Sequence, residues 1–254
     1  MNPLPAPRVG GGLFVTGTDT GVGKTFIACA IARNWRAIGV DVAPRKPVES
    51  GCPERDGHLF PADAALLAAA AGLPAARIGE VNRYRLAEPL APDLAARLAG
   101  RPLHLADLVA ACARPEGAWR ITEGAGGLYS PLCEDGLNAD LAQALGDPVL
   151  LVAEDRLGTL SGCLLALEAL DRRGLTVAGI VLNRRRGDAH PAMDNRMTLA
   201  QRSGHPVWSI PEGAPPAEVD QMLSASSSSM VSPPEPGSAG SNPGAGMTSG
   251  AARS

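Results

Sequence analysis

Residues 13–25 read LFVTGTDTGVGKT, and this stretch decides the fold. Its apolar start is typical of a buried strand, and the apolar residues that follow it begin a helix. A glycine-rich turn between such a strand and helix lets backbone N–H groups surround phosphate oxygens, and the helix N-terminus faces them with positive charge. Lys24 adds a mobile positive charge, and Thr25 adds a hydroxyl suited to Mg²⁺. The stretch therefore predicts a phosphate-binding loop.

The spacing of this loop differs from the usual pattern, because five residues rather than four separate Gly17 from Gly23. A glycine-rich turn that binds nothing is the alternative. However, a Gly-Lys-Thr sequence between a strand and a helix has no packing rationale. We therefore expect a nucleotide at this turn, which by itself does not define a reaction.

Beyond the loop, short apolar runs alternate with helical patterns, as in parallel sheets built from β-α-β units. They predict strands at 13–16, 40–44, 119–122, 149–153, 177–182 and 207–210, and helices at 24–38, 63–71, 105–113, 138–145, 160–170 and 193–202. Asn138 is the expected N-cap of its helix. The pattern predicts a three-layer α/β fold of the P-loop NTPase type, with a mostly parallel central sheet flanked by helices.

The composition favours one globular domain followed by a tail. The chain has 254 residues, of which 45% are apolar and 19% charged, as is usual for globular proteins. We expect a single domain at 1–223. Residues 224–254 are almost entirely Ser, Gly, Pro and Ala, which cannot bury enough apolar surface to offset chain entropy. That tail is predicted to be disordered.

Charge and cysteine content exclude several classes of protein. A net charge of −3 provides no long-range attraction for nucleic acid, and the run Arg184, Arg185 and Arg186 is expected to be a solvated loop. We find no signal peptide and no apolar run long enough for a membrane helix, so a cytoplasmic protein with neither membrane nor nucleic-acid partners is expected. Five widely separated cysteines predict neither disulfides nor a zinc site.

Three charged residues outside the loop are candidates for chemistry. Lys46 follows the second predicted strand and would project into the crevice at the carboxyl end of the sheet. A lysine that extends along the surface into solvent is an equal alternative. Asp63 opens a predicted helix, and Glu123 follows a predicted strand and precedes glycines that allow phosphate to approach closely. With Thr25, these carboxylates form a hard-oxygen ligand set for Mg²⁺. The alternative role of Asp63 is a helix N-cap, which is compatible with the role of a ligand.

Several motifs together carry a family resemblance. They are GTDTGVGKT at 17–25, KPVESG at 46–51, Asp63, AEPLAP at 87–92, EGAGGL at 123–128 and LGTLS at 157–161. In this order and spacing, about residues 12–218 resemble the dethiobiotin synthetase family. The resemblance implies that 7,8-diaminononanoate, CO₂ (or bicarbonate) and ATP are the substrates, that Mg²⁺ is the cofactor, and that the protein is a homodimer with its substrate site at the subunit interface.

The resemblance also implies a role for each motif. CO₂ adds to one amine as a carbamate, the γ-phosphoryl group activates the carbamate, and the second amine closes a cyclic urea. The implied catalytic residues are Lys24, Lys46 and Thr20, Ser50 binds substrate, and Thr25, Asp63 and Glu123 hold Mg²⁺. The residues implied to contact ATP are Gly21, Val22, Gly23, Lys24, Thr25, Phe26, Asp63, Glu123, Gly124, Ala125, Gly126, Asn183, Arg184, Pro211, Glu212, Gly213 and Glu218.

The implied adenine site has an open alternative, and the chain departs from the family in two places. Asn183 would read adenine and Pro211–Gly213 with Glu218 would close over it, but Asn183 could equally be a turn residue at a strand end. Gly21 stands where many relatives carry Glu. Ser161-Gly162 stands where the family often has Asn-His, at the helix N-terminus thought to receive the substrate carboxylate from the neighbouring subunit.

Two other functions stay open from the sequence. One is another P-loop synthetase that forms amides, although the chain has no glutaminase domain. The other is an ATP-dependent switch like the ParA and MinD partition ATPases. Those ATPases have a lysine at the position of Asp19, and the missing lysine disfavours that alternative.

Overall fold

The computed structural model describes residues 11–184 and 193–224. Its centre is a six-stranded sheet with the order β12-β11-β10-β1-β7-β2, and every neighbouring pair is parallel. The strands are β1 (Gly12–Gly17), β2 (Val42–Arg45), β7 (Trp119–Glu123), β10 (Val149–Glu154), β11 (Val177–Asn183) and β12 (Val207–Ile210). The predicted α/β fold with a parallel central sheet is therefore confirmed.

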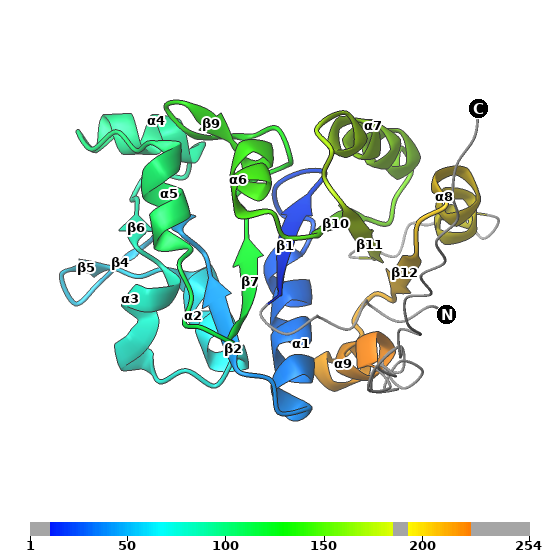
Figure 1. The fold of residues 1–254 in the computed structure, drawn as a ribbon, viewed down its shortest axis with the longest axis horizontal. Helices are drawn as coiled ribbons and strands as arrows, with labels where there is room; N and C mark the ends of the chain where they lie inside the picture. The colour runs from blue at the N-terminus through cyan, green and yellow to red at the C-terminus, as the bar shows by residue number, and fades with distance from the viewer. Residues whose placement is uncertain (1–10, 185–192, 225–254) are drawn as a thin grey trace, which may run out of the picture.

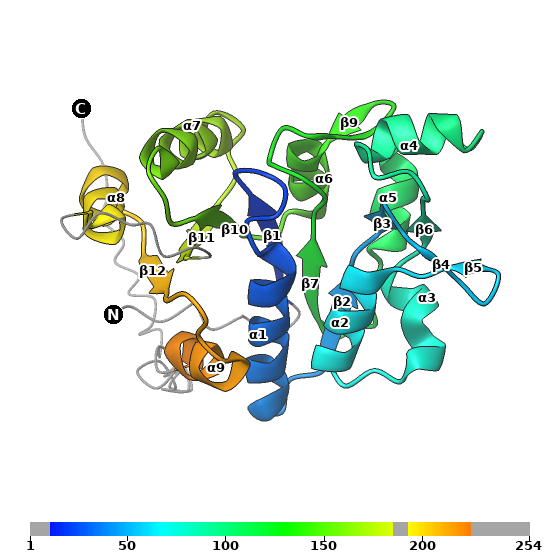
Figure 2. The ribbon, with the colours of Figure 1, turned by 180° about the vertical axis from the view of Figure 1, so that it is seen from behind.

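Helices cover both faces of this sheet (Figure 1). One face carries α1 (Lys24–Ala37), α2 (Ala62–Ala70) and α9 (Pro216–Ser224). The other carries α4 (Pro92–Leu98), α5 (Leu105–Ala111), α6 (Asn138–Leu145), α7 (Thr159–Arg172) and α8 (Asn195–Ser203). The short α3 (Ile78–Val81) follows a 3-10 turn, Ala75–Arg77, beside α2. Viewed from behind, α1 lies along the middle of the molecule between α9 and α2 (Figure 2).

The side chains of β1 show how one strand serves two cores. Leu13 and Val15 pack with α1 and α2, whereas Phe14 packs with the helices of the opposite face. Successive side chains of a strand point to opposite faces, so a strand covered on both sides is apolar throughout. This explains why the buried strands read as continuous apolar runs in the sequence.

Three small strand pairs lie outside the central sheet and were not predicted. They are β3 (Val48–Glu49) with β6 (Tyr84–Arg85), β4 (Glu54–Arg55) with β5 (His58–Leu59), and β8 (Pro131–Cys133) with β9 (Gly136–Leu137). Helices α3, α4 and α9 were not predicted either. The pair β3 and β6 matters for the site, because it carries the segment that follows Lys46.

The prediction for Asn138 was wrong. The N-cap of α6 is Leu137, and Asn138 is the first helical residue. Its buried amide instead accepts a hydrogen bond from the Ala125 N–H at 3.0 Å and donates one to the Gly127 carbonyl at 3.0 Å. Asn138 therefore holds the glycine-rich loop after β7 rather than its own helix.

Several other expectations concern the ends of the chain and its surface. The predicted tail starts at the last residue of α9 and otherwise lies outside the described residues, as do Arg185 and Arg186. The single domain and the disordered tail stay predictions. None of the described helices is long and apolar enough to cross a membrane. All five cysteines are buried free thiols.

Candidate active site

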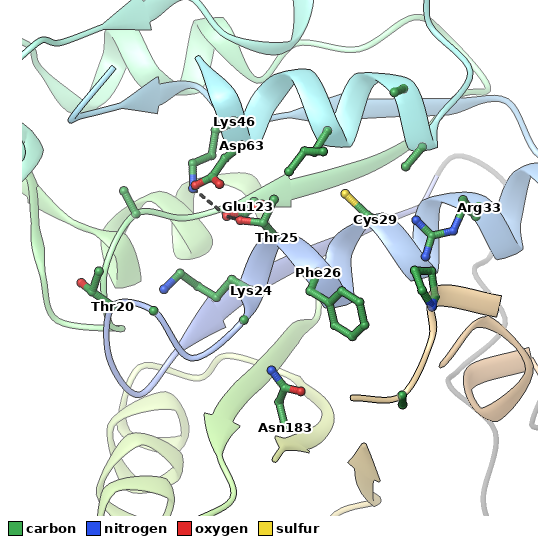
Figure 3. A pocket seen from close by; sticks show the side chains of 18 of the residues that line it. Thr20, Lys24, Thr25, Phe26, Cys29, Arg33, Lys46, Asp63, Glu123 and Asn183 are labelled. Carbon is green, nitrogen blue, oxygen red and sulfur yellow. Dashed lines mark hydrogen bonds and ion pairs between the residues drawn. The ribbon is translucent and has the colours of Figure 1, made fainter. Parts of the chain in front are cut away.

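A cavity of about 1200 Å³ opens at the carboxyl ends of the central strands, above the N-terminus of α1. Its walls come from the phosphate-binding loop, the start of α2, the segment after β7, the end of β11 and the segment before α9. Figure 3 shows Lys46, Asp63, Glu123 and Thr25 grouped together, Asn183 on the opposite side, and Lys24 and Phe26 between them. Ligands of open parallel sheets bind at this edge.

The phosphate-binding loop is held in shape by Asn183. Gly23 has a φ of +99°, and a Cβ atom built on it would lie 2.2 Å from the Asn183 Nδ2 atom. That same Nδ2 atom donates a hydrogen bond of 3.0 Å to the Val22 carbonyl. Only glycine has both the left-handed conformation and the missing side chain that this contact requires.

Lys24 spans the loop and is buried. Its Nζ atom donates a hydrogen bond of 2.9 Å to the Asp19 carbonyl. Burial, and secondarily the nearby Lys46 ammonium, lower the pKa of Lys24 to about 8, against the opposing pull of Glu123 and Asp63. A bound phosphate would stabilise the ammonium form, because it would place negative charge beside the Lys24 side chain.

Lys46 is also buried and forms the centre of a charged cluster. Its Nζ atom lies 2.6 Å from Glu123 Oε1, 3.0 Å from the Gly124 carbonyl and 3.5 Å from Asp63 Oδ2. Burial lowers the pKa of Lys46, but Glu123 and then Asp63 more than offset this, so the net shift is upward. The alternative of a surface lysine extending into solvent is therefore wrong.

The backbone of Lys46 is fixed by residues from the far end of α3. The Lys46 N–H donates to the Val81 carbonyl at 2.8 Å, and the buried Asn82 amide donates to the Lys46 carbonyl at 2.7 Å. These bonds turn the chain after β2 so that the lysine side chain enters the cavity. Asn82 thus holds the backbone of Lys46 in place without lining the cavity itself.

The side-chain oxygens of Glu123 and Thr25 lie together at the start of α1. The Thr25 hydroxyl donates to Glu123 Oε1 at 2.8 Å. The other carboxylate oxygen, Oε2, is buried and has no hydrogen-bond partner among the described residues. A buried carboxylate oxygen without a partner is costly, and two carboxylates with a hydroxyl are the hard donors that Mg²⁺ prefers together with phosphate oxygens. The residues present therefore fit the ion.

The N-cap alternative for Asp63 was wrong. Helix α2 begins at Ala62, its N-cap is Pro61, and no side chain of that residue caps it. The first-turn N–H groups are bound by the carboxylate of Glu49, so the Asp63 carboxylate is left to face Lys46. Burial raises the pKa of Glu49, and its bonds to the N–H groups of Ala64 and Asp63 oppose that shift.

Most of the predicted site residues meet at this one cavity. Those that line it are Thr20, Gly21, Gly23, Lys24, Thr25, Phe26, Lys46, Ser50, Asp63, Glu123, Ala125, Gly126, Asn183, Arg184, Pro211 and Gly213. Four others do not: Val22 is buried beneath the loop, Gly124 contributes its carbonyl to Lys46, and Glu212 and Glu218 are exposed outside it.

Several lining residues were missed by the sequence analysis. They are Cys29, Arg33, Glu49, Leu66, Ala69, Ala70, Ala214, Pro215 and Pro216. Helical spacing could have found Cys29 and Arg33, because residues four and eight positions after Thr25 share its helix face. Burial raises the pKa of the Cys29 thiol to about 12, so this thiol stays protonated and unreactive at neutral pH. No local pattern marked the α2 residues.

Lys24 should be the more reactive of the two lysine side chains toward acylation. Lys24 and Lys46 are the only lysines in the sequence. With its pKa lowered to about 8, Lys24 is largely a nucleophilic amine above that pH and an unreactive ammonium below it, whereas the pKa of Lys46 is raised. Amine-selective acylation followed by peptide mass spectrometry should modify Lys24 before Lys46, with half-maximal rate at Lys24 near pH 8, and MgATP should protect Lys24. Faster modification of Lys46, or a midpoint near that of free lysine, would contradict this assignment.

The parallel sheet, the phosphate-binding loop at its edge and the charged side chains beside that loop define a P-loop nucleotide-binding protein. In agreement, the family model described as an AAA domain matches residues 11–212. The ATP-dependent dethiobiotin synthetase BioD of Anaeromyxobacter dehalogenans is 48% identical over 72% of this chain and 80% of that protein. The BioD of Methylobacterium nodulans is 39% identical over 79% of this chain and 93% of that protein. The chain belongs to the dethiobiotin synthetase family.

Among solved structures, chloroplast FtsY from Physcomitrella patens is similar with a TM-score of 0.44 and 18% identity, over 88% of this chain and 67% of that one. The family assignment depends on the dethiobiotin synthetases, which confirm the resemblance noted in the sequence.

Proposed function

We propose that this protein is a Mg²⁺-dependent enzyme that converts 7,8-diaminononanoate, CO₂ and ATP into dethiobiotin, ADP and phosphate. The observation that carries the proposal is the buried cluster of Lys46 and Glu123 directly beside Thr25 of the phosphate-binding loop. A buried lysine held at a triphosphate site is suited to a reaction in which anionic oxygens of two reactants must approach each other. The names of the relatives disfavour both the partition-type switch and another amide-forming synthetase.

The proposed reaction proceeds in three steps: carbamate formation, phosphoryl transfer and ring closure. One amine of the substrate attacks CO₂ and loses a proton, which forms a carbamate. A carbamate oxygen attacks the γ-phosphorus of ATP, and the bond to ADP breaks, which forms a carbamic-phosphoric anhydride. The second amine then attacks the carbamate carbon, loses a proton and expels phosphate as the urea ring closes. Positioning and charge stabilisation supply most of the catalysis of such a phosphoryl transfer.

The two lysines act on the phosphoryl transfer. Lys24 would leave the Asp19 carbonyl and contact the β- and γ-phosphates, as its place in the loop requires. Lys46 would contact the carbamate and the γ-phosphate from the opposite side of the cavity. Their charges offset the negative charge that accumulates as two anions meet.

Thr25, Asp63 and Glu123 would hold Mg²⁺, which when bound neutralises phosphate oxygens. Because Lys46 now pairs with both carboxylates, it is expected to shift toward the anionic reactants when the ion is present. Thr20 and Ser50 line the same cavity and would hydrogen-bond the carbamate or the diamine.

The adenine end of the site is proposed at the end of β11. The side-chain amide of Asn183 donates one N–H to the Val22 carbonyl. Its second N–H and its oxygen could form hydrogen bonds with adenine. Arg184, Pro211 and Gly213 line the cavity beside it, and exposed Glu212 and Glu218 would close over the base. Helix α9 is anchored nearby because Arg33 binds Asp220 through two hydrogen bonds of 2.7 Å.

The direct test incubates the purified protein with the diamine, bicarbonate and MgATP and detects dethiobiotin by mass spectrometry. One ADP should form for each dethiobiotin. ATP hydrolysis that depends on a different carboxylate or amine, without dethiobiotin, would favour another amide-forming synthetase. Nucleotide-dependent binding to DNA or vesicles without small-molecule turnover would favour the switch.

The proposed homodimer has its own test. Leu157 is 86% exposed and lies just before α7, whose start approaches Thr18 of the phosphate-binding loop through Gly162. If the partner subunit packs there, Leu157→Asp should lower the dimer fraction in light scattering and reduce turnover at low protein concentration. Ile38→Asp is the matched control, because Ile38 is 64% exposed at the far end of α1. A monomeric wild-type protein with full turnover would exclude the interface.

A further inference from the structure

The carboxylate of Glu49 caps a helix that belongs to another part of the chain. Glu49 ends β3 and is buried, at 6% exposure. Its two oxygens accept hydrogen bonds of 3.0 Å from the N–H groups of Asp63 and Ala64. These N–H groups lie in the first turn of α2, where a helix cannot satisfy them itself. The cap therefore comes from a residue 14 positions earlier in the sequence.

This cap determines what the Asp63 side chain can do. An aspartate near a helix start usually folds back onto free N–H groups of its own turn. Here those groups are occupied by Glu49, and the Asp63 carboxylate, 44% exposed, lies 3.5 Å from Lys46 Nζ instead. The bond to its own N–H also holds the Asp63 backbone in place. Glu49 thus frees and aims a carboxylate that lines the cavity.

We propose that Glu49 is a positioning residue for the cation site, because it fixes the start of α2 and thereby the distance of the Asp63 carboxylate from Thr25 and Glu123. This inference rests on the proposed function, in which Asp63 is a ligand of Mg²⁺. Glu49 lines the cavity as well, so direct binding of a substrate amine by its carboxylate is the competing role. Removing the carboxylate should weaken Mn²⁺ binding if Glu49 positions Asp63, and should raise KM for the diamine if Glu49 binds the substrate amine.

The test measures Mn²⁺ binding by electron paramagnetic resonance, with a nonhydrolysable ATP analogue present. In Glu49→Ala, both N–H groups lose their partner, and Mn²⁺ affinity should fall about tenfold, the effect expected for loss of a helix cap. Glu49→Gln keeps one acceptor oxygen, so the Mn²⁺ affinity of this variant should lie between those of Glu49→Ala and wild type. Metal-free affinity for the analogue and KM for the diamine should stay within about twofold of wild type.

A matched control separates positioning from general destabilisation. Asp107 caps α5, which contributes no residue to the cavity, by accepting a hydrogen bond of 2.9 Å from the His104 N–H. Asp107→Ala should lower the melting temperature about as much as Glu49→Ala and leave Mn²⁺ affinity unchanged. If Glu49→Ala keeps wild-type Mn²⁺ affinity, or if only KM for the diamine rises, the positioning role is overturned.

Asp63→Asn separates the positioning role of Glu49 from the proposed role of Asp63 as a ligand of Mg²⁺. Asp63→Asn should weaken Mn²⁺ binding at least as much as Glu49→Ala, because it removes the ligand itself. If Asp63→Asn binds Mn²⁺ like wild type, Asp63 is not a ligand, and both the proposed metal site and the role of Glu49 fall. If Asp63→Asn weakens binding but Glu49→Ala does not, only the role of Glu49 falls.

Discussion

Lys46→Gln is expected to reduce turnover by about a thousandfold or more and to leave MgATP affinity nearly unchanged. Preorganised charges at an anionic transition state contribute about 10²–10³ each to the rate, and glutamine has no charge to offer. Lys24 and the backbone of the phosphate-binding loop would still hold the triphosphate. The expected result is therefore a fall in kcat without a matching rise in the Kd of MgATP.

Single-turnover kinetics should measure the rate of Lys46→Gln, and calorimetry should measure its affinity for a nonhydrolysable ATP analogue, each against wild type. Arg55→Gln is a suitable control, because it removes an exposed positive charge from the β4–β5 hairpin outside the cavity. Without ligands, Lys46→Gln should also melt at a lower temperature, since Glu123 loses its buried partner. Equal losses of nucleotide affinity and rate would show that Lys46 only holds phosphate.

Glu123→Gln should damage both stability and function. In the structure, Glu123 Oε1 accepts from Lys46 and from Thr25, while Oε2 is buried without a partner among the described residues. A neutral amide leaves the buried Lys46 ammonium with only the more distant Asp63 carboxylate at 3.5 Å as a partner. Breaking such a buried pair typically costs about 3–5 kcal/mol in the free energy of unfolding. Loss of one carboxylate oxygen and of the negative charge should also lower turnover about a thousandfold.

Denaturant unfolding and Mg²⁺ titration of the rate separate these two effects. The control is Glu134→Gln, which removes a carboxylate from an exposed residue outside the cavity. High Mg²⁺ should restore part of the Glu123→Gln rate if the residue acts as a ligand. A stable variant with wild-type Mg²⁺ dependence would place the ion elsewhere.

The sequence predicted the elements that depend on local patterns. The six central strands are apolar runs, because each is covered on both faces, and all six were predicted within a few residues of their ends. The phosphate-binding loop was visible because its glycines, Lys24 and Thr25 act within one turn of the chain. Helix α9 was missed because its start reads Pro-Pro-Ala-Glu, and its position depends on the contact of Asp220 with Arg33.

The candidate site was predicted residue by residue but not as a set of contacts. Lys46, Asp63 and Glu123 each stood at the end or start of an expected element, where side chains of parallel sheets converge. Neither the burial of Lys46 nor the cap supplied by Glu49 had a local signal. Asn138 was misassigned for the same reason, since its amide binds a loop 11 to 13 residues earlier rather than its own helix.

The sequence by itself determined a parallel α/β fold with a triphosphate site, because strand, helix and loop signals arise from neighbouring residues. The tertiary structure alone decided that Lys46 pairs with Glu123, 77 residues away, and that Glu49 holds the start of α2. The order of strands places β7 between β1 and β2, so the ends of these three strands meet at one point. Contacts between residues so far apart in the chain depend on that order, which no local pattern encodes.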